Sequence, residues 1–204
     1  LALKKYPAVI VIHENRGLNA HIEDVTRRAA LAGFLAIAPD GLSSVGGTPA
    51  NEDAARDLFS KLVPEENTAR FAATLPYLKS RPDCTGSIGC VGFCWGGAMA
   101  NSLAVTVPEM KAAVAFYGRQ PESGKVPAIK AAIQLHYGAL DERVNAGLTS
   151  YEEALKANGI RYEQYIYEGV NHAFHNDTSA ARYNKEAATL AWSRTIAFLT
   201  RYLA

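Results

Sequence analysis

The chain of 204 residues has few of the features that mark a membrane, metal-binding or disulfide-linked protein. Its three cysteines are an odd count without C-x-x-C or C-x-x-H spacing, so neither a disulfide framework nor a zinc site is indicated. No stretch approaches the roughly 20 apolar residues of a membrane span. The net charge is +1 and the two signs are interspersed. We therefore expect no cofactor, metal, nucleic-acid or membrane partner, and no oligomeric state is indicated.

Several common motifs are also missing. No Lys-Ser or Lys-Thr follows the glycines near residue 92, and G-x-G-x-x-G does not occur, so neither a P-loop nor a dinucleotide fingerprint is present. No H-E-x-x-H occurs, so His13-Glu14 is not a zinc motif. The chain starts Leu-Ala-Leu-Lys-Lys rather than with Met, as expected of a shortened chain. Any leader peptide would then have been removed, so the compartment is not determined and the cytoplasm is the default expectation.

Apolar runs and amphipathic segments alternate along the whole chain, of which 49% is hydrophobic. This alternation predicts one α/β domain over 1–204, with a mostly parallel central sheet and helices on both faces. Pro64 is expected to separate two helices. The expected strands are 8–12, 34–38, 87–92, 112–117, 131–137 and 161–167. The expected helices are 21–33, 53–63, 68–80, 97–106, 146–158 and 184–203, and 41–51 is expected to be an irregular surface loop.

The most informative segment is Gly-Cys-Val-Gly-Phe-Cys-Trp-Gly-Gly at 89–97. An apolar run enters it and a small-residue helical run leaves it, so it reads as strand, sharp turn and helix. Gly92 and Gly96 flank Cys94 in the pattern G-x-C-x-G, the cysteine version of the nucleophile elbow. A turn this tight strains the backbone of the nucleophile and leaves no room for neighbouring Cβ atoms. Cys94 is therefore predicted to be a nucleophile at a helix N-terminus, where a thiolate is favoured.

A cysteine nucleophile needs a base and a group that orients the base. Asp141 follows the strand expected at 131–137, and His172 follows the last expected strand. The order nucleophile, acid, histidine is that of α/β-hydrolases. Taken singly, Asp141 fits a turn or helix cap and His172 a loop histidine, but together they predict a Cys-His-Asp triad.

The remaining cysteines and histidines fit structural roles better. Cys90 lies inside an expected strand and Cys84 in the loop before it, where a small buried hydrophobe is the usual interpretation. Among the histidines, His175 is close enough to His172 to compete with it, but only His172 follows the strand directly. The other three are expected to be structural: His13 at a strand end, His21 at a helix start and His136 within a strand.

Several of these segments resemble the dienelactone hydrolases (carboxymethylenebutenolidases), a family with the α/β-hydrolase fold. The resemblance rests on Gly-Phe-Cys-Trp-Gly-Gly at 92–97, Gly-x-x-Asp at 138–141 and His-Ala-Phe at 172–174. His-Glu-Asn-Arg-Gly-Leu at 13–18 and Ala-Pro-Asp at 38–40 also match, and the resemblance extends from about Tyr6 to Leu203. Members of the family usually carry an extra N-terminal strand pair, and we expect this chain to lack it.

The resemblance implies roles for the residues that match. Cys94 would attack a lactone or ester carbonyl, His172 would relay the proton and Asp141 would orient His172. Glu14 matches the family glutamate that contacts the cysteine at rest and helps to form the thiolate when substrate enters; the alternative is an ion pair with a basic side chain such as Arg16. The oxyanion donors are assigned as a hypothesis to the backbone N–H groups of Trp95 and Asn15.

The same resemblance limits the substrate. Family members hold a substrate carboxylate with arginines, one of them shortly after the catalytic histidine, but residues 172–176 here are His-Ala-Phe-His-Asn. Arg16 or Arg56 is the expected substitute. Trp95, Tyr117, Tyr137 and Phe174 are expected to give the pocket an aromatic lining. The expected substrate is therefore a small lactone or ester other than dienelactone itself.

Two alternatives to this hydrolase remain at the level of sequence. The first is a non-catalytic α/β-hydrolase relative that binds a small ligand and keeps a vestigial triad. The second makes Cys94 a redox thiol with Cys90 as its resolving partner, although a Cys90 buried in the strand gives this pair poor geometry.

Overall fold

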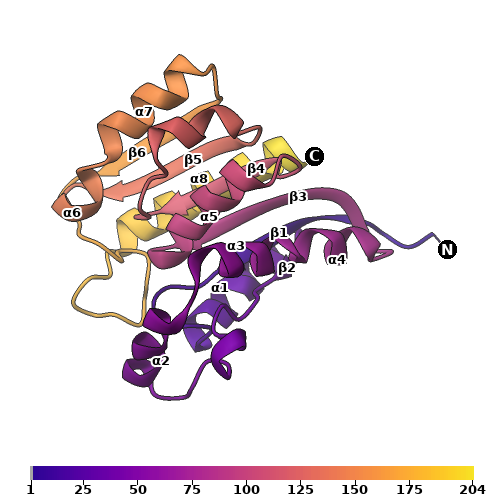
Figure 1. The fold of residues 1–204 in the computed structure, drawn as a ribbon, viewed down its shortest axis with the longest axis horizontal. Coiled ribbons are helices and arrows are strands. Elements are labelled where there is room, and N and C mark those ends of the chain that lie inside the picture. Colours follow the sequence, from indigo (N-terminus) through magenta and orange to yellow (C-terminus); the bar gives the residue numbers. More distant parts are fainter. Residues whose placement is uncertain (1) are drawn as a thin grey trace.

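Six parallel strands form the centre of the molecule, which the computed structural model describes from residue 2 to residue 204 (Figure 1). The strands lie in the order β2-β1-β3-β4-β5-β6, and each neighbouring pair is parallel, as the alternation of elements predicted. Their bounds are β1 Tyr6–Ile12, β2 Leu35–Ile37, β3 Cys84–Phe93, β4 Ala112–Phe116, β5 Ala132–Gly138 and β6 Tyr162–Tyr167.

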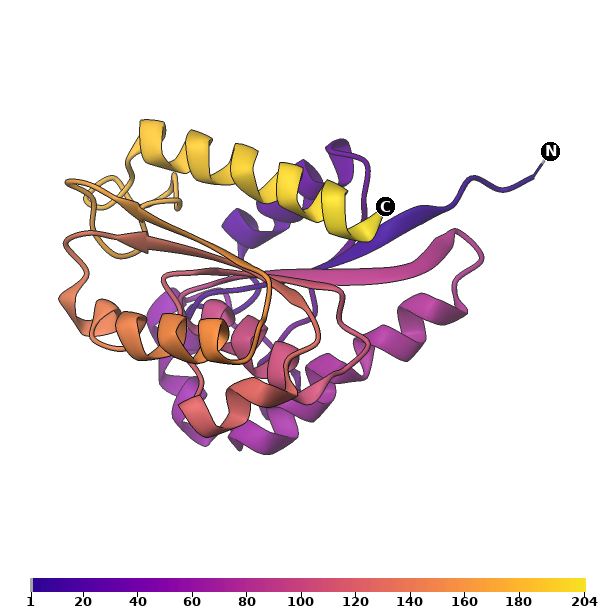
Figure 2. The ribbon, with the colours of Figure 1, turned by 90° about the horizontal axis from the view of Figure 1, so that it is seen from above.

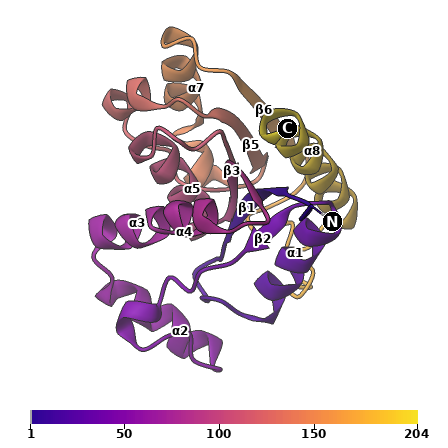
Figure 3. The ribbon, with the colours of Figure 1, turned by 90° about the vertical axis from the view of Figure 1, so that its right-hand side faces the viewer.

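Helices cover both faces of this sheet, as expected. In Figures 2 and 3, α1 and α8 lie over one face, and α3, α4, α5 and α7 lie over the other. The shorter helices α2 and α6 are parts of connections between strands and the longer helices. The bounds are α1 Ala20–Leu31, α2 Glu52–Leu58, α3 Pro64–Ala72, α4 Thr74–Ser80, α5 Trp95–Thr106, α6 Glu142–Asn145, α7 Leu148–Ala157 and α8 Lys185–Leu203.

Successive side chains of β1 point to opposite faces of the sheet, so one apolar run supplies both cores. Val9 and Val11 pack in the cluster under α1 and α8, with Val25 of α1 among their neighbours. Ile10 and Ile12 pack in the cluster on the opposite face. All these side chains are fully buried. A strand without polar alternation is thus an interior strand of the sheet, between β2 and β3, and is buried on both faces.

Pro64 separates two helical segments, as expected: the first ends at Lys61 and α3 begins at Pro64. The second segment begins four residues earlier than expected, because the first helical position has no intrahelical partner for its N–H and suits the fixed φ of proline. The expected helix 68–80 is divided at Ala73 into α3 and α4, and Pro76 explains the division. A proline there lacks the N–H that a continuous helix would bond to Ala72.

Two further expectations are corrected in the connections. Cys84 lies in the first position of β3 and is buried, not in a loop, because β3 begins three residues earlier than expected and pairs there with Tyr6. Helix α6, directly after Asp141, was not expected at all. At four residues it is too short for a hydrophobic periodicity to reveal it.

The irregular segment expected at 41–51 is fastened to the chain after β1. The Asp40 carboxylate accepts hydrogen bonds from the backbone N–H and hydroxyl of Thr48, each at 2.8 Å. The Thr48 hydroxyl in turn accepts the N–H of Leu18 at 2.9 Å. This loop therefore fixes the segment that carries Glu14, Asn15 and Arg16.

Candidate active site

Cys94 occupies a strained turn between β3 and α5. Its backbone has φ 57° and ψ −114°, a conformation that residues other than glycine rarely adopt. A Cβ on Gly92 would lie 1.8 Å from the carbonyl oxygen of Gly96, and one on Gly96 would lie 2.3 Å from the carbonyl oxygen of Ile12. Glycine is therefore required at both positions, and the turn has the form predicted for a nucleophile elbow.

The structure brings Cys94, His172 and Asp141 into one chain of contacts. The Nε2 atom of His172 lies 3.1 Å from the Cys94 sulfur, and its Nδ1 atom lies 2.6 Å from an Asp141 carboxylate oxygen. A carboxylate only accepts, so His172 carries its proton on Nδ1 and its Nε2 lone pair faces the thiol. These residues follow β3, β5 and β6, and the carboxyl ends of parallel strands meet at one edge of the sheet.

Asp141 combines the two roles that the sequence left open. One carboxylate oxygen contacts His172, while the other accepts the N–H of Val144 at 3.4 Å as the N-cap of α6. Asn145 from the same helix donates to the carbonyl oxygen of Gly138 at 2.8 Å. The short helix thereby fixes the carboxylate against the end of β5.

The surroundings of the Cys94 thiol favour its neutral form. Burial and the nearby Glu14 charge raise its pKa to about 11, while hydrogen bonds from the backbone N–H groups of Trp95 and Asn15 act in the opposite direction. The two amides expected to bind an oxyanion therefore both lie at the Cys94 thiol. At neutral pH the resting side chain is a thiol.

Glu14 is buried beside this thiol, but its hydrogen bond goes elsewhere. Asn176 donates to a Glu14 carboxylate oxygen at 2.9 Å, and within residues 2–204 the carboxylate has no hydrogen bond with Cys94. The expected resting contact between the two is therefore not seen, because His172 already occupies the thiol. Burial raises the pKa of Glu14 to about 7, with Asn176 opposing the shift.

His13 has the structural role expected of it and positions the neighbouring backbone. Its Nδ1–H donates to the carbonyl oxygen of Glu14 at 2.8 Å, and its Nε2 accepts the N–H of Gly41 at 2.8 Å. The ring is stacked on Trp95 with centroids 5.3 Å apart. The indole of Trp95 thus packs on His13 while its backbone N–H faces the thiol.

Two of the four residues expected to bind substrate are placed unfavourably for it. Phe174 is fully buried and packs against Tyr117 and Tyr167, so this expectation is corrected: an apolar ring after β6 fills the core. Arg56 is exposed and pairs with Asp53 and Asp57 on its own helix, where neighbours one and three positions apart satisfy its charge. Within residues 2–204 neither side chain has a hydrogen bond, ion pair or ring contact with the predicted triad.

The other two residues expected to bind substrate, Arg16 and Tyr117, lie next to the site. Arg16 is half-buried, with one guanidinium nitrogen 3.4 Å from the carbonyl oxygen of Asn15. Tyr117 is buried beneath His172, with ring centroids 4.9 Å apart, and has a positive φ of 37°. Its hydroxyl is buried without a hydrogen-bond partner within residues 2–204. Tyr117 therefore supports the imidazole from below.

Sequence reasoning missed Asn176 and His21 as neighbours of Glu14. Asn176 stands in the stretch where the family resemblance implied an arginine, and its amide holds Glu14. The Nε2 atom of His21 lies 3.8 Å from a Glu14 carboxylate oxygen. For Asn176 a signal was present, since a polar residue replaces the implied arginine; for His21 only the packing of α1 on β1 makes the contact.

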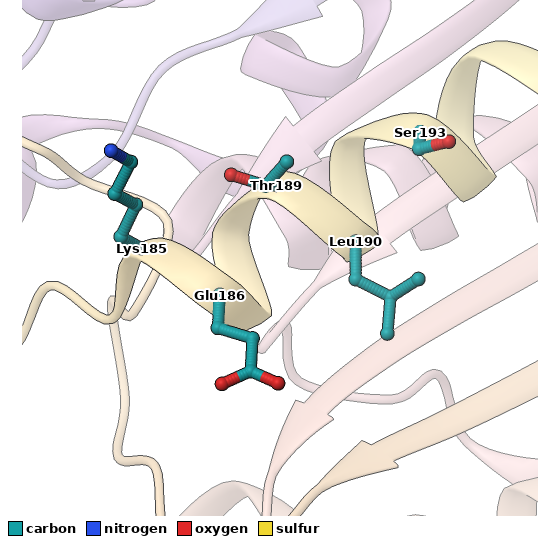
Figure 4. A pocket seen from close by; sticks show the side chains of 5 residues that line it. All are labelled: Lys185, Glu186, Thr189, Leu190 and Ser193. Carbon is teal, nitrogen blue, oxygen red and sulfur yellow. The ribbon is translucent and has the colours of Figure 1, made fainter.

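The part of the chain described offers no other evident centre. No three or more of its His, Cys, Asp and Glu side chains form a group suited to a metal ion. None of the helices in residues 2–204 is long and apolar enough to span a bilayer. The depression in Figure 4 is lined only by α8 and contains none of the predicted site residues.

The geometry also argues against the redox pair. Cys90 is fully buried within β3, and burial raises its pKa to about 12. Three strand residues, 91–93, lie between it and Cys94, and an extended strand of this length spans about 10 Å at about 3.3 Å per residue. A disulfide needs Cα atoms within about 7 Å, so the two cysteines are too far apart to form one.

Comparison with known proteins agrees with this architecture. The chain matches the model of the dienelactone hydrolase family over residues 2–203. A Synechocystis protein named "Putative carboxymethylenebutenolidase" is 32% identical over 95% of this chain and 85% of its own length. A crystal structure titled "Putative Dienelactone Hydrolase" from Klebsiella pneumoniae superposes with a TM-score of 0.88 at 29% identity, covering 98% of this chain and 88% of that one.

A more distant structure defines the fold class. An α/β-hydrolase enzyme from a deep-sea metagenome library superposes with a TM-score of 0.74 at 15% identity, over 98% of this chain and 85% of that one. The fold is thus that of the α/β-hydrolases. Within that class, the chain belongs to the dienelactone hydrolase family. The predicted fold class is confirmed, and so is the expectation of a hydrolase of ester or lactone type.

Proposed function

We propose that this protein hydrolyses small carboxylic esters or lactones with Cys94 as the nucleophile, His172 as the base and Asp141 as the group that orients His172. The observation that carries the proposal is the continuous chain from the Cys94 sulfur to His172 at 3.1 Å and on to Asp141 at 2.6 Å. Asp141 and Cys94 are 31 and 78 positions away from His172 in sequence, and their contacts with His172 support a role in acyl transfer.

In the first half of the reaction the thiol proton moves to His172 Nε2 as the sulfur attacks the carbonyl carbon. Asp141 stabilises the imidazolium that results. The carbonyl oxygen takes up negative charge, which the N–H groups of Trp95 and Asn15 stabilise. When the tetrahedral intermediate collapses, the C–O bond breaks and the leaving oxygen takes the proton from His172. The product at this stage is a thioester on Cys94.

In the second half of the reaction, water attacks the thioester and hydrolyses it. His172 Nε2 removes a proton from the water as its oxygen attacks, and the C–S bond breaks. Cys94 regains its proton from His172, and the carboxylic acid leaves. Atoms balance without any cofactor, since water is the only other reactant.

Glu14 controls how readily the thiol ionises. While Glu14 is charged, its field raises the pKa of Cys94, and a neutral Glu14 removes that penalty. Because burial places the pKa of Glu14 at about 7, a small change in its surroundings on substrate entry is enough to neutralise it. A resting thiol is also less prone to oxidation than a standing thiolate, which suits a cysteine nucleophile.

The substrate preference follows from the side chains around the triad. Asn176 stands where an arginine would hold a substrate carboxylate, and Arg56 is paired on its own helix. Arg16 is the cation next to the oxyanion amide of Asn15. We therefore favour small, uncharged lactones or esters over dienelactone.

The test uses p-nitrophenyl acetate and intact-protein mass spectrometry. Wild-type protein should release p-nitrophenolate, and acid-quenched enzyme should carry one acetyl group on Cys94. Cys94→Ala should lose both signals, while Cys84→Ala, a buried cysteine at the far end of β3, should keep them. Full activity of Cys94→Ala would refute the proposal, and no turnover of a broad ester panel by wild-type protein would favour a non-catalytic ligand-binding relative.

A further inference from the structure

A second imidazole lies behind the site, between two carboxyl groups. His21 of α1 is 4% exposed, and neither of its ring nitrogens has a hydrogen-bond partner within residues 2–204. Its Nε2 lies 3.8 Å from a Glu14 oxygen, and its Nδ1 lies 3.5 Å from an Asp177 oxygen. Buried polar nitrogens are rarely left without partners, so this arrangement calls for an explanation.

The chemistry of the two carboxyl groups fixes where the proton of His21 resides. Asp177 is partly exposed and held by Arg28 at 2.6 Å, which keeps Asp177 ionised, and an ionised carboxylate can only accept. The Nδ1 atom therefore carries the proton and points it at Asp177. The Nε2 atom then has a lone pair directed at Glu14. An ionised Glu14 repels that lone pair, whereas a protonated Glu14 donates to it after a movement of about 1 Å.

We propose that His21 is a positioning residue for the proton on Glu14: Asp177 holds the imidazole with its proton on Nδ1, so that the Nε2 lone pair stabilises the protonated carboxyl of Glu14. This inference rests on the proposed function only in the use that the enzyme makes of a neutral Glu14. It does not depend on turnover, because the state of Glu14 acts on the Cys94 thiol in the absence of any substrate.

Other charges also face these two groups. Around Glu14, Asn176, Arg16 and Arg182 favour the ionised form, while burial and Glu52 favour the neutral one. Burial disfavours a charge on His21, as Arg28 does, and Asp177 and Asp24 favour it. His175 lies nearby with its ring centroid 6.4 Å away and is itself kept neutral by burial. Of these groups only His21 directs a lone pair at Glu14. That lone pair faces Glu14 because Asp177 holds the imidazole proton on the opposite nitrogen, Nδ1.

The reaction of Cys94 with iodoacetamide as a function of pH provides a test that needs no ester. The rate follows the thiolate fraction, and ionisation of Glu14 lowers that fraction, so the wild-type profile should flatten near pH 7. Cys84 and Cys90 are buried, and peptide mass spectrometry separates their products from that of Cys94. Glu14→Gln should abolish the flattening and so assign it.

Two variants should shift this feature in the same direction. His21→Gln presents an amide donor to Glu14, and Asp177→Asn lets His21 carry its proton on Nε2 instead. Each stabilises the ionised form of Glu14, so the flattening should move down by about one pH unit and alkylation at pH 7 should slow. If Asp177 acts through His21, the double variant should show no further shift beyond His21→Gln.

Asp24→Asn is the matched control. Asp24 pairs with the same Arg28 at 2.5 Å, but within residues 2–204 it has no hydrogen bond or ion pair with the imidazole and acts on it only through its charge. The profile of this variant should therefore shift far less than that of Asp177→Asn. Asp177 is at the surface, so its variant tests the inference even if His21→Gln does not fold. An unmoved profile in Asp177→Asn, additive shifts in the double variant, or a wild-type profile without a feature that Glu14→Gln removes would each overturn the inference. Full ester turnover in Cys94→Ala, or no turnover by wild-type protein, would count against the proposed function and leave this result unaffected.

Discussion

Cys90 and Cys94 lie four residues apart at one end of β3, yet their environments differ in almost every respect. Cys90 is fully buried in a regular strand, and its thiol faces an apolar core. Cys94 has a positive φ, is partly exposed, and contacts His172 and two backbone amides. The pKa of each thiol is raised by burial, to about 12 and about 11. What distinguishes Cys94 from Cys90 is therefore the set of groups that contact its thiol, more than the acidity of that thiol.

The largest effect should come from removing the negative charge of Asp141, which contacts His172. Asp141→Asn should lower kcat for p-nitrophenyl acetate by about 10⁴-fold, because an amide can donate to Nδ1 and so favours the wrong tautomer. Asparagine is as good an N-cap as aspartate, so α6 and the melting temperature should change little. Steady-state kinetics with a parallel thermal melt check this. A variant that loses both activity and stability would show that Asp141 is mainly a cap.

A substitution at Gly92 tests the tight turn at Cys94 directly. Gly92→Ala places a Cβ 1.8 Å from a backbone oxygen, so it should destabilise the protein by more than about 3 kcal/mol. Gly124→Ala is the matched control, since nothing lies within 4 Å of its Cβ and its φ is not positive. Urea unfolding of both variants measures the difference. Equal midpoints for the two would contradict the close approach at the turn.

A third prediction concerns the pH dependence of stability. Folding raises the pKa of buried Glu14 from 4.5 to about 7, so the folded protein favours the protonated form and loses stability as pH rises from about 4.5 through 7. Glu14→Gln does not titrate and should gain about 3 kcal/mol relative to wild type between pH 4.5 and 8. Denaturant unfolding at both pH values checks this; a difference between the two proteins that does not change with pH would contradict it.

The smallest effect should come from substituting Cys90, the buried cysteine of the pair. Cys90→Ala removes one buried sulfur and should cost about 1–2 kcal/mol of stability through the cavity that it leaves. Its kcat should equal that of wild type, because within residues 2–204 Cys90 has no hydrogen bond with the proposed triad. A large loss of activity without loss of fold would show that Cys90 takes part in the chemistry after all.

The sequence alone was enough to predict the parallel sheet, because long apolar runs bounded by glycine and proline have few other interpretations. It was also enough to predict the turn at Cys94, since glycine at both flanking positions is needed wherever backbones approach so closely. Proline was ambiguous: Pro64 begins a helix, although proline can equally end one. The local sequence pattern thus predicts which helices and strands form better than it predicts where they begin and end.

Tertiary structure decided which side chains meet. Phe174 and His172 are two residues apart, yet one fills the core and the other reaches the thiol, and only the path of the loop after β6 separates them. The neighbours of Glu14 come from α1 and from residue 176, far away in the chain. Contacts of this kind depend on packing between distant elements, which leaves no periodic signal in the sequence. The pKa values of Cys94 and Glu14 follow mainly from the burial that this packing produces.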